Sequence, residues 1–231
     1  MGQVKSSKRS VPGQQPLTFG KVKPELDKAL QYLKTCDDYT TTKARKALET
    51  IGNALEEVDD IGEKPVTSYL VKQGFGELFP RMWSGLCAFL ENEKWGQQGY
   101  KSLEEMLGTY CTFTDPCHEL AAELGKCGSI PLLLAGLGKL EIYFEDEDKF
   151  EPIEDVVAYI IGILFISISQ CSSNRKIFRD AKAFDILKEY LKLQNKTVSG
   201  FSLMILAYVV DESESSVLAT GDGIVARLWS T

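Results

Sequence analysis

The first six residues form the pattern with the clearest chemical consequence. The opening M-G-Q-V-K-S matches M-G-x-x-x-[ST], in which Gly2 becomes N-terminal and accepts a myristoyl chain. One myristoyl chain binds a membrane only marginally, with an association constant of about 10⁴ M⁻¹. Each nearby Lys or Arg adds roughly 1 kcal/mol at an anionic leaflet, and Lys5, Lys8 and Arg9 lie close behind Gly2. The alternative is an unmodified tail that begins Met-Gly by chance.

The residue types give little support to catalysis. His118 is the single histidine and follows Cys117, but adjacent side chains on a helix diverge by about 100°, so this neighbourhood does not make a dyad. Asp115-Pro116 predicts a helix cap and first turn, which would place His118 on the surface. The sequence has no G-x-S-x-G, no phosphate loop and no zinc-ligand spacing. We therefore expect no catalytic, cofactor or metal site.

Charge is unevenly distributed along the chain. The net charge is −7, but the segment from Met1 to Lys23 contains five basic residues and no acid, so the remainder carries −12 (−7 minus 5). An acidic body argues against nucleic-acid binding, which needs a basic face. The six cysteines include no C-x-x-C pair and follow no apolar leader. These features predict unpaired thiols in a cytoplasmic protein.

The spacing of apolar residues predicts helices and no strand. Residues 1–22 lack apolar periodicity and predict a disordered basic arm. Helical spacing begins at Pro24, a residue suited to a first turn, and residues 23–231 form the predicted helical domain. A second helix is predicted from an i, i+3, i+4, i+7 pattern at Ala44, Ala47, Leu48, Ile51, Leu55 and Val58. The apolar run Val156–Ser169 is shorter than the roughly 20 residues of a membrane span, so it predicts a buried helix.

An internal repeat organises this helical region. Four segments read as a short helix, a tight break and a new helix, and the new helices begin at Phe75, Ile130, Phe184 and Ile224. The first two intervals between these starts are nearly equal, and the third is shorter. Polar stretches at 91–99 and 145–152 are interpreted as insertions into a period of roughly 40–47 residues. Glycines at three breaks, Gly74, Gly128 and Gly223, are predicted to supply the turn.

The segments from Lys126 to Leu134, Tyr159 to Ser169 and Asn174 to Phe178 resemble armadillo repeats, most clearly over residues 115–231. The resemblance implies an all-α, armadillo-like right-handed α-solenoid of about three to four irregular repeats, with the chain stopping inside a unit. It also implies a protein or peptide ligand on a concave face, built from the helices that begin at Phe75, Ile130, Phe184 and Ile224. A non-catalytic scaffold or adaptor is therefore expected, tethered to an anionic membrane surface through its arm. One alternative is the regulatory segment of a larger signalling protein, for example one with a TIR domain; the other is an enzyme.

The lipidation pattern predicts that N-myristoyltransferase transfers labelled myristate to Gly2. The Gly2→Ala variant should take up no label, because the acceptor position is specific to glycine. Mass spectrometry of the N-terminal peptide measures the transfer. An unlabelled wild-type peptide would exclude the lipid tether.

Overall fold

The computed structural model describes residues 17–58, 60–87, 97–141, 153–181, 183–193 and 195–209. Within these ranges the chain forms eleven α-helices and no strand, apart from one isolated bridge between Leu17 and Val58. The predicted all-α class is therefore confirmed. In chain order the helices are α1 (Phe19–Thr35), α2 (Thr42–Glu57), α3 (Asp60–Lys72), α4 (Phe75–Cys87), α5 (Gln97–Thr114), α6 (His118–Lys126), α7 (Ser129–Leu140), α9 (Glu154–Gln170), α10 (Ser172–Asp180), α11 (Ala183–Tyr190) and α12 (Lys196–Val209).

Two of the helix predictions can be compared residue by residue with the structure. The apolar pattern from Ala44 to Val58 is confirmed, because all six of its members are buried along α2 and the residue that caps this helix. The predicted start at Pro24 is wrong, because α1 begins at Phe19. The extra turn is held by the buried side chain of Val22 and by a ring contact between Phe19 and Tyr69.

The breaks between short and following helices adopt the predicted geometry where the structure describes them. Gly74 separates α3 from α4 with a φ of 71°, and Gly128 separates α6 from α7 with a φ of 77°. This left-handed region is costly for residues with a Cβ atom, so glycine is the residue that allows the chain to turn there. The new helices begin at Phe75, Ser129 and Ala183, each at the predicted start or directly before it.

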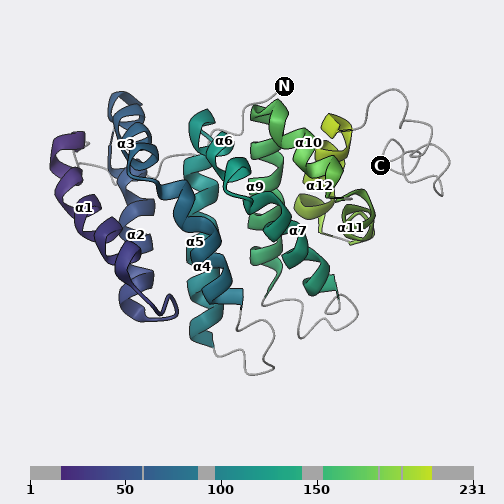
Figure 1. The fold of residues 1–231 in the computed structure, drawn as a ribbon, viewed down its shortest axis with the longest axis horizontal. Helices are drawn as coiled ribbons and strands as arrows, with labels where there is room; N and C mark the ends of the chain where they lie inside the picture. Colours follow the sequence, from purple (N-terminus) through teal and green to yellow (C-terminus); the bar gives the residue numbers. More distant parts are fainter. Residues whose placement is uncertain are drawn as a thin grey trace.

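The helices form rows in which the members lie next to one another. We call α2, α5, α9 and α12 the long-helix layer, because α5 packs against both α2 and α9, and α9 also packs against α12. These helices follow one another from left to right in Figure 1. The short helices α3, α6 and α10 follow the upper edge of the same view, with contacts between α3 and α6 and between α6 and α10.

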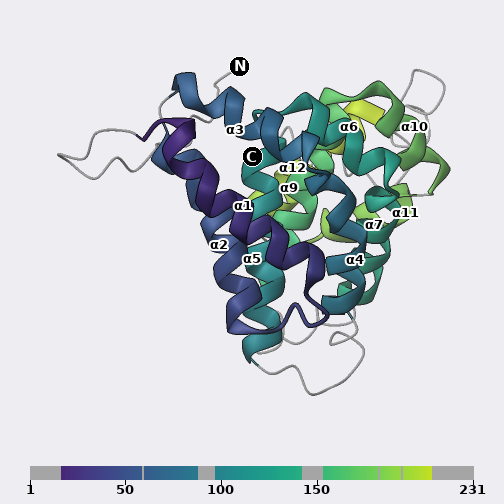
Figure 2. The same ribbon diagram turned by 60° about the vertical axis from the view of Figure 1, so that its left-hand side comes forward.

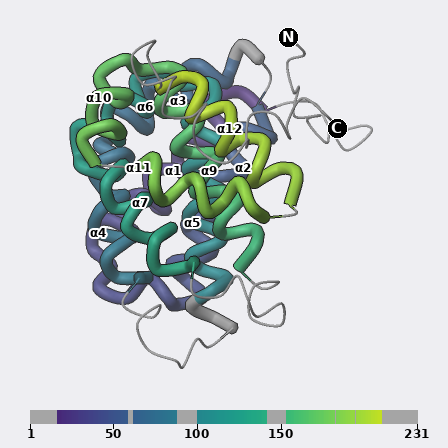
Figure 3. The backbone as a smooth tube through the Cα atoms, turned by 90° about the vertical axis from the view of Figure 1, so that its right-hand side faces the viewer, coloured from purple at the N-terminus to yellow at the C-terminus, as the bar shows by residue number. Residues whose placement is uncertain are grey.

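A third row consists of α4, α7 and α11, which again contact one another in that order. Figure 2 shows α4 and α7 on the opposite side from α2 and α5, and Figure 3 shows them to the left of α5 and α9. In the long-helix layer, α5, α9 and α12 therefore each have one face toward α4, α7 or α11, whereas α2 packs against α1. The flanks of these helices face their neighbours in the same layer. The face that remains is the candidate binding surface.

The core confirms the buried helix predicted over Val156–Ser169. In α9 the side chains of Val156, Val157, Ile160, Ile161 and Leu164 are completely buried. In the described ranges no single helix combines the length and hydropathy needed to cross a bilayer, and α6 with α7 reaches them only as a pair bent by 76°. Buried polar groups tie the rows together: the Tyr110 hydroxyl of α5 donates to the Phe75 carbonyl of α4 over 2.5 Å.

Several predictions fall outside the described residues. They are residues 1–16 of the basic arm, with Gly2, Lys5, Lys8 and Arg9, the fourth break at Gly223, the fourth helix start at Ile224, and the insertions except for 97–99, which belong to α5. The predicted end of the disordered arm at residue 22 is wrong, because residues 19–22 belong to α1.

Candidate functional site

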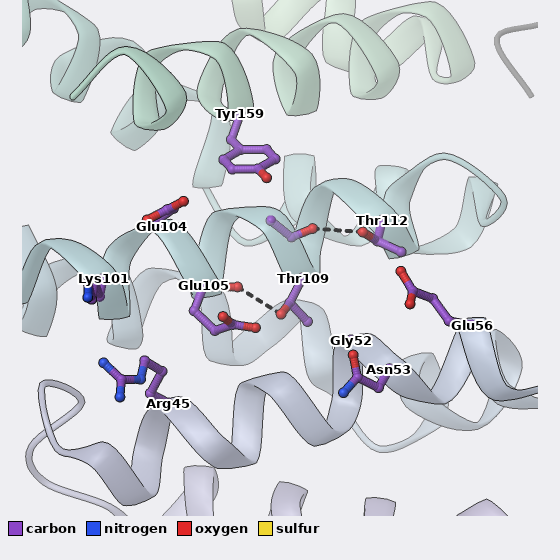
Figure 4. Close-up of a pocket in the computed structure, with 11 residues that line it drawn as sticks. Arg45, Gly52, Asn53, Glu56, Lys101, Glu104, Glu105, Thr109, Thr112 and Tyr159 are labelled. Carbon is purple, nitrogen blue, oxygen red and sulfur yellow. Dashed lines mark hydrogen bonds between the residues drawn. The ribbon is translucent and has the colours of Figure 1, made fainter. Parts of the chain in front are cut away.

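A groove of about 440 Å³ runs along the long-helix layer. Its walls come from three consecutive members of that layer, α2, α5 and α9. The lining residues are Arg45, Gly52, Asn53 and Glu56 from α2, Lys101, Glu104, Glu105, Gly108, Thr109 and Thr112 from α5, and Tyr159 from α9. Figure 4 shows Arg45 and Lys101 at one end, Glu56 near Thr112 at the other, and the Tyr159 ring above α5.

Glycine residues lie where the long helices that form the groove meet one another. A Cβ atom added to Gly52 of α2 would lie 3.4 Å from the Thr109 hydroxyl of α5. One added to Gly108 of α5 would lie 3.5 Å from the Tyr159 ring of α9, and one added to Gly162 of α9 would lie 3.4 Å from the Cys111 sulfur of α5. Each contact leaves room for a methyl group and little more.

Hydrogen bonds fix the groove floor. The Thr109 hydroxyl donates to the Glu105 carbonyl at 2.8 Å within α5, and it lies 3.4 Å from the Leu48 carbonyl of α2. Thr112 donates to the Gly108 carbonyl at 3.0 Å, and Figure 4 marks its bond and the bond to Glu105. Because Thr109 is buried, its hydroxyl acts as a polar link between neighbouring helices rather than as a ligand group.

The groove side chains that reach solvent are amide, hydroxyl and charged groups. Asn53, Glu56, Lys101 and Thr112 are exposed, while Glu104, Glu105 and Tyr159 are half-buried. Asparagine and threonine side chains can both donate and accept hydrogen bonds. The surface can therefore pair with peptide N–H and C=O groups as well as with charged side chains.

Carboxylates dominate the electrostatics of the middle of the groove. Burial, and then the nearby Asp155 carboxylate, raise the pKa of Glu104 against the opposing effect of Lys101. Burial also raises the pKa of Glu105, together with Glu49 and Glu104, against the effect of Arg45. The same negative surroundings add to burial in raising the pKa of the Tyr159 hydroxyl. A positive charge placed here would relieve the repulsion between these acids.

Burial is likewise the main reason that the pKa of Tyr100, one turn before Glu104 on α5, is raised to about 12. After burial, the contributions to that increase decrease in the order Glu104, Asp155, Tyr159. One negative environment therefore surrounds four titratable groups, namely Tyr100, Glu104 and Glu105 of α5 and Tyr159 of α9. It extends the acidic character of the groove toward the start of both helices.

The other predicted residues have simpler surroundings. His118 is the exposed first residue of α6, as predicted, although its N-cap is Cys117 rather than Asp115. The Cys117 sulfur lies 3.7 Å from a Glu119 carboxylate oxygen, and burial raises the pKa of this thiol. Gly74 and Gly128 lie at helix breaks away from the groove lining.

The groove does not lie on the helices where the binding face was expected. Those described helices are α4, α7 and α11, which bury aromatic and aliphatic side chains, including Phe75, Leu133 and Leu187. A second periodic signal points to the observed layer. Gly52, Gly108 and Gly162 recur along the chain at nearly the same interval as the first three predicted helix starts. These glycines mark the long-helix layer in the sequence, whereas the helix starts from which the binding face was predicted mark another row.

Comparison with known proteins gives no family assignment. No protein-family profile and no curated protein matches the chain. A crystal structure described as that of an engineered protein is 15% identical, with a TM-score of 0.37, over 80% of this chain and 47% of that chain. The chain thus matches less than half the length of the engineered protein, and a likeness this remote carries no argument about fold or function.

The raised pKa of Glu105 predicts that Glu105→Gln stabilises the protein at pH 7. When folding raises the pKa of a carboxyl, the folded state loses stability as the pH rises from the ordinary pKa of that carboxyl, 4.5, through its raised value in the folded protein. Glutamine cannot ionise and avoids this loss. The variant should therefore unfold at a higher temperature than wild type at pH 7, and the difference should shrink at pH 4.

Thermal unfolding monitored by circular dichroism measures the unfolding temperatures of wild type and variant at each pH. Glu25→Gln, at an exposed position on α1, is the control for loss of one negative charge. A stabilisation by Glu105→Gln that is the same at pH 4 and pH 7 would show that ionisation of Glu105 is not its cause.

Proposed function

We propose that this protein is a non-catalytic, armadillo-like binding scaffold that receives an extended segment of a partner protein in the α2–α5–α9 groove. The observation that carries the proposal is a polar groove shared by three consecutive helices of one layer. In this proposal, the α1–α2 pair and the triads α3–α4–α5, α6–α7–α9 and α10–α11–α12 are four units of an irregular solenoid. Stacking is necessary because one such unit cannot close a core by itself.

The chemistry of the groove favours a peptide over a small apolar molecule. An extended peptide has unpaired backbone donors and acceptors along its length, and the Asn53 amide can pair with both kinds of group. The Thr112 hydroxyl, which donates to the Gly108 carbonyl, can accept from a peptide N–H. The side chains that reach into the groove are mostly polar or charged. Small-molecule sites, in contrast, are lined mainly by apolar and aromatic side chains.

The charges further specify the partner segment. Glu104 and Glu105 lie in the middle of the groove. Burial and repulsion by Asp155 raise the pKa of Glu104, and burial with repulsion by Glu49 and Glu104 raises the pKa of Glu105. A Lys or Arg side chain of the partner would be attracted to this region. The proposed ligand is therefore an extended segment with at least one basic residue.

A tether through Gly2, Lys5, Lys8 and Arg9 completes the proposed function. These residues lie in the arm before Leu17, so acylation and membrane attraction would leave the groove on the helical body available. The acyl chain would supply about 10⁴ M⁻¹ of membrane affinity, and the basic residues would supply the rest.

A steric block in the groove should remove the partners. Thr112 is exposed and lines the groove, so Thr112→Arg places a long cationic side chain there without disturbing the core. We expect at least about a tenfold loss of each specific partner, as is typical when a central contact is lost. Thr35→Arg, at an exposed site on α1 away from the groove, makes the same chemical change as a control.

Affinity purification of the full chain from cell extract, followed by quantitative mass spectrometry, compares the three proteins. Partners depleted by Thr112→Arg and retained by Thr35→Arg would support the groove as the binding surface. Equal retention by all three baits would reject that surface.

A further inference from the structure

The acidic groove begins next to the point where the basic arm joins the folded domain. The Leu17 backbone N–H donates to the Glu57 carbonyl at 2.7 Å, and Leu17 pairs with the buried Val58 at the end of α2. Glu56, the residue before Glu57, lines the groove. The chain that precedes Leu17 is therefore attached at the Glu56 end of the groove, the right-hand end in Figure 4.

The charges of the two parts are complementary. Five acids line or adjoin the groove, namely Glu49, Glu56, Glu104, Glu105 and Asp155, against the two bases Arg45 and Lys101. The five acids and two bases leave an excess of three negative charges. The arm before Leu17 contains three basic residues, Lys5, Lys8 and Arg9, and no acid.

The distances allow the two to meet. Arg45 and Glu56 are eleven residues apart on α2, so the groove runs for about 16 Å along this helix. Arg9 is eight residues before Leu17, and an extended chain of that length reaches about 27 Å. Lys8 and Arg9 can thus reach Glu104 and Glu105 while Leu17 stays paired with Val58.

We propose that residues 1–16 of this chain bind in the α2–α5–α9 groove, with Lys8 and Arg9 opposite Glu104 and Glu105. This inference rests on the groove being the binding surface proposed above, and it adds a means of regulation. The arm occupies the place of the partner segment and lowers the partner's apparent affinity. Lys5, Lys8 and Arg9 also form the proposed membrane contact, so an anionic membrane withdraws the arm and opens the groove.

Trypsin cleavage after Arg9 tests this contact without any partner, because a bound arm is protected from the protease. The experiment uses the full, non-acylated chain at low salt, and mass spectrometry follows the initial rate at which the peptide ending at Arg9 is released. Glu104→Gln combined with Glu105→Gln should accelerate that release about three- to tenfold, as expected for loss of a few exposed charge pairs.

A charge-matched variant separates the groove from a general effect of net charge. Glu25→Gln combined with Asp180→Asn removes two exposed acids on α1 and α10, outside the groove, and should leave the cleavage rate unchanged. Salt at roughly 0.5 M, where charges are screened within a few ångströms, should bring wild type to the rate of the groove variant. Circular dichroism and thermal unfolding confirm that each variant is folded.

The inference is overturned if the groove variant and wild type release the peptide at equal rates, or if the charge-matched variant accelerates release as much. Neither result would count against the proposed partner site, because that site is tested separately by the Thr112→Arg comparison. Conversely, accelerated release with unchanged partner retention would support an arm contact and reject the proposed partner site.

Discussion

The close approach of consecutive long helices is the contact on which the rest of the structure depends. At Gly52, Gly108 and Gly162 the neighbouring helix lies 3.4 to 3.5 Å from where a Cβ atom would be. These contacts bring α2, α5 and α9 into one layer, and α4 and α7 then pack behind it. Larger residues would separate the helices and widen the floor of the groove. At present the Thr109 hydroxyl of α5 lies 3.4 Å from the Leu48 carbonyl of α2.

The same spacing explains the electrostatic character of the groove. Because α2, α5 and α9 lie side by side, acids from different helices repel one another. Glu49 of α2 acts on Glu105 of α5, and Asp155 of α9 acts on Glu104 of α5. Their partial burial makes the repulsion stronger than it would be in open solvent. Because the pKa values of Glu104 and Glu105 are raised, ionising these carboxyls costs the folded state stability, and a cationic side chain of the proposed partner would offset that cost.

The sequence predicted the helices well because each one has a buried face with a regular period. The spacing in α2, the apolar run of α9 and the breaks at Gly74 and Gly128 are local signals, and the structure has them where they were predicted. The start of α1 was missed because Pro24 is a favourable first-turn residue, while Val22 and Phe19 gain tertiary contacts that extend the helix. Tertiary packing decided this boundary.

The groove could not be predicted with the same success because it depends on which helices become neighbours. Glu105 and Glu49 are far apart in the sequence, and so are Glu104 and Asp155. Their proximity follows only from the order of packing in the long-helix layer. The regular recurrence of Gly52, Gly108 and Gly162 is consistent with this order of helices. A glycine in a helix has no side chain, however, so its position alone does not predict which helix packs against it.

The most direct measurement of this packing compares Gly162→Leu with Gly200→Leu by thermal unfolding. Gly162 is buried against the Cys111 sulfur, whereas Gly200 of α12 has no atom within 4 Å of an added Cβ. Leucine at position 162 should force α9 and α5 apart and destabilise the protein by about 1–3 kcal/mol. Leucine at position 200 should be neutral or stabilising, since it favours the helix more than glycine does. Equal destabilisation by the two changes, or stabilisation by Gly162→Leu, would contradict the close-packed layer of long helices.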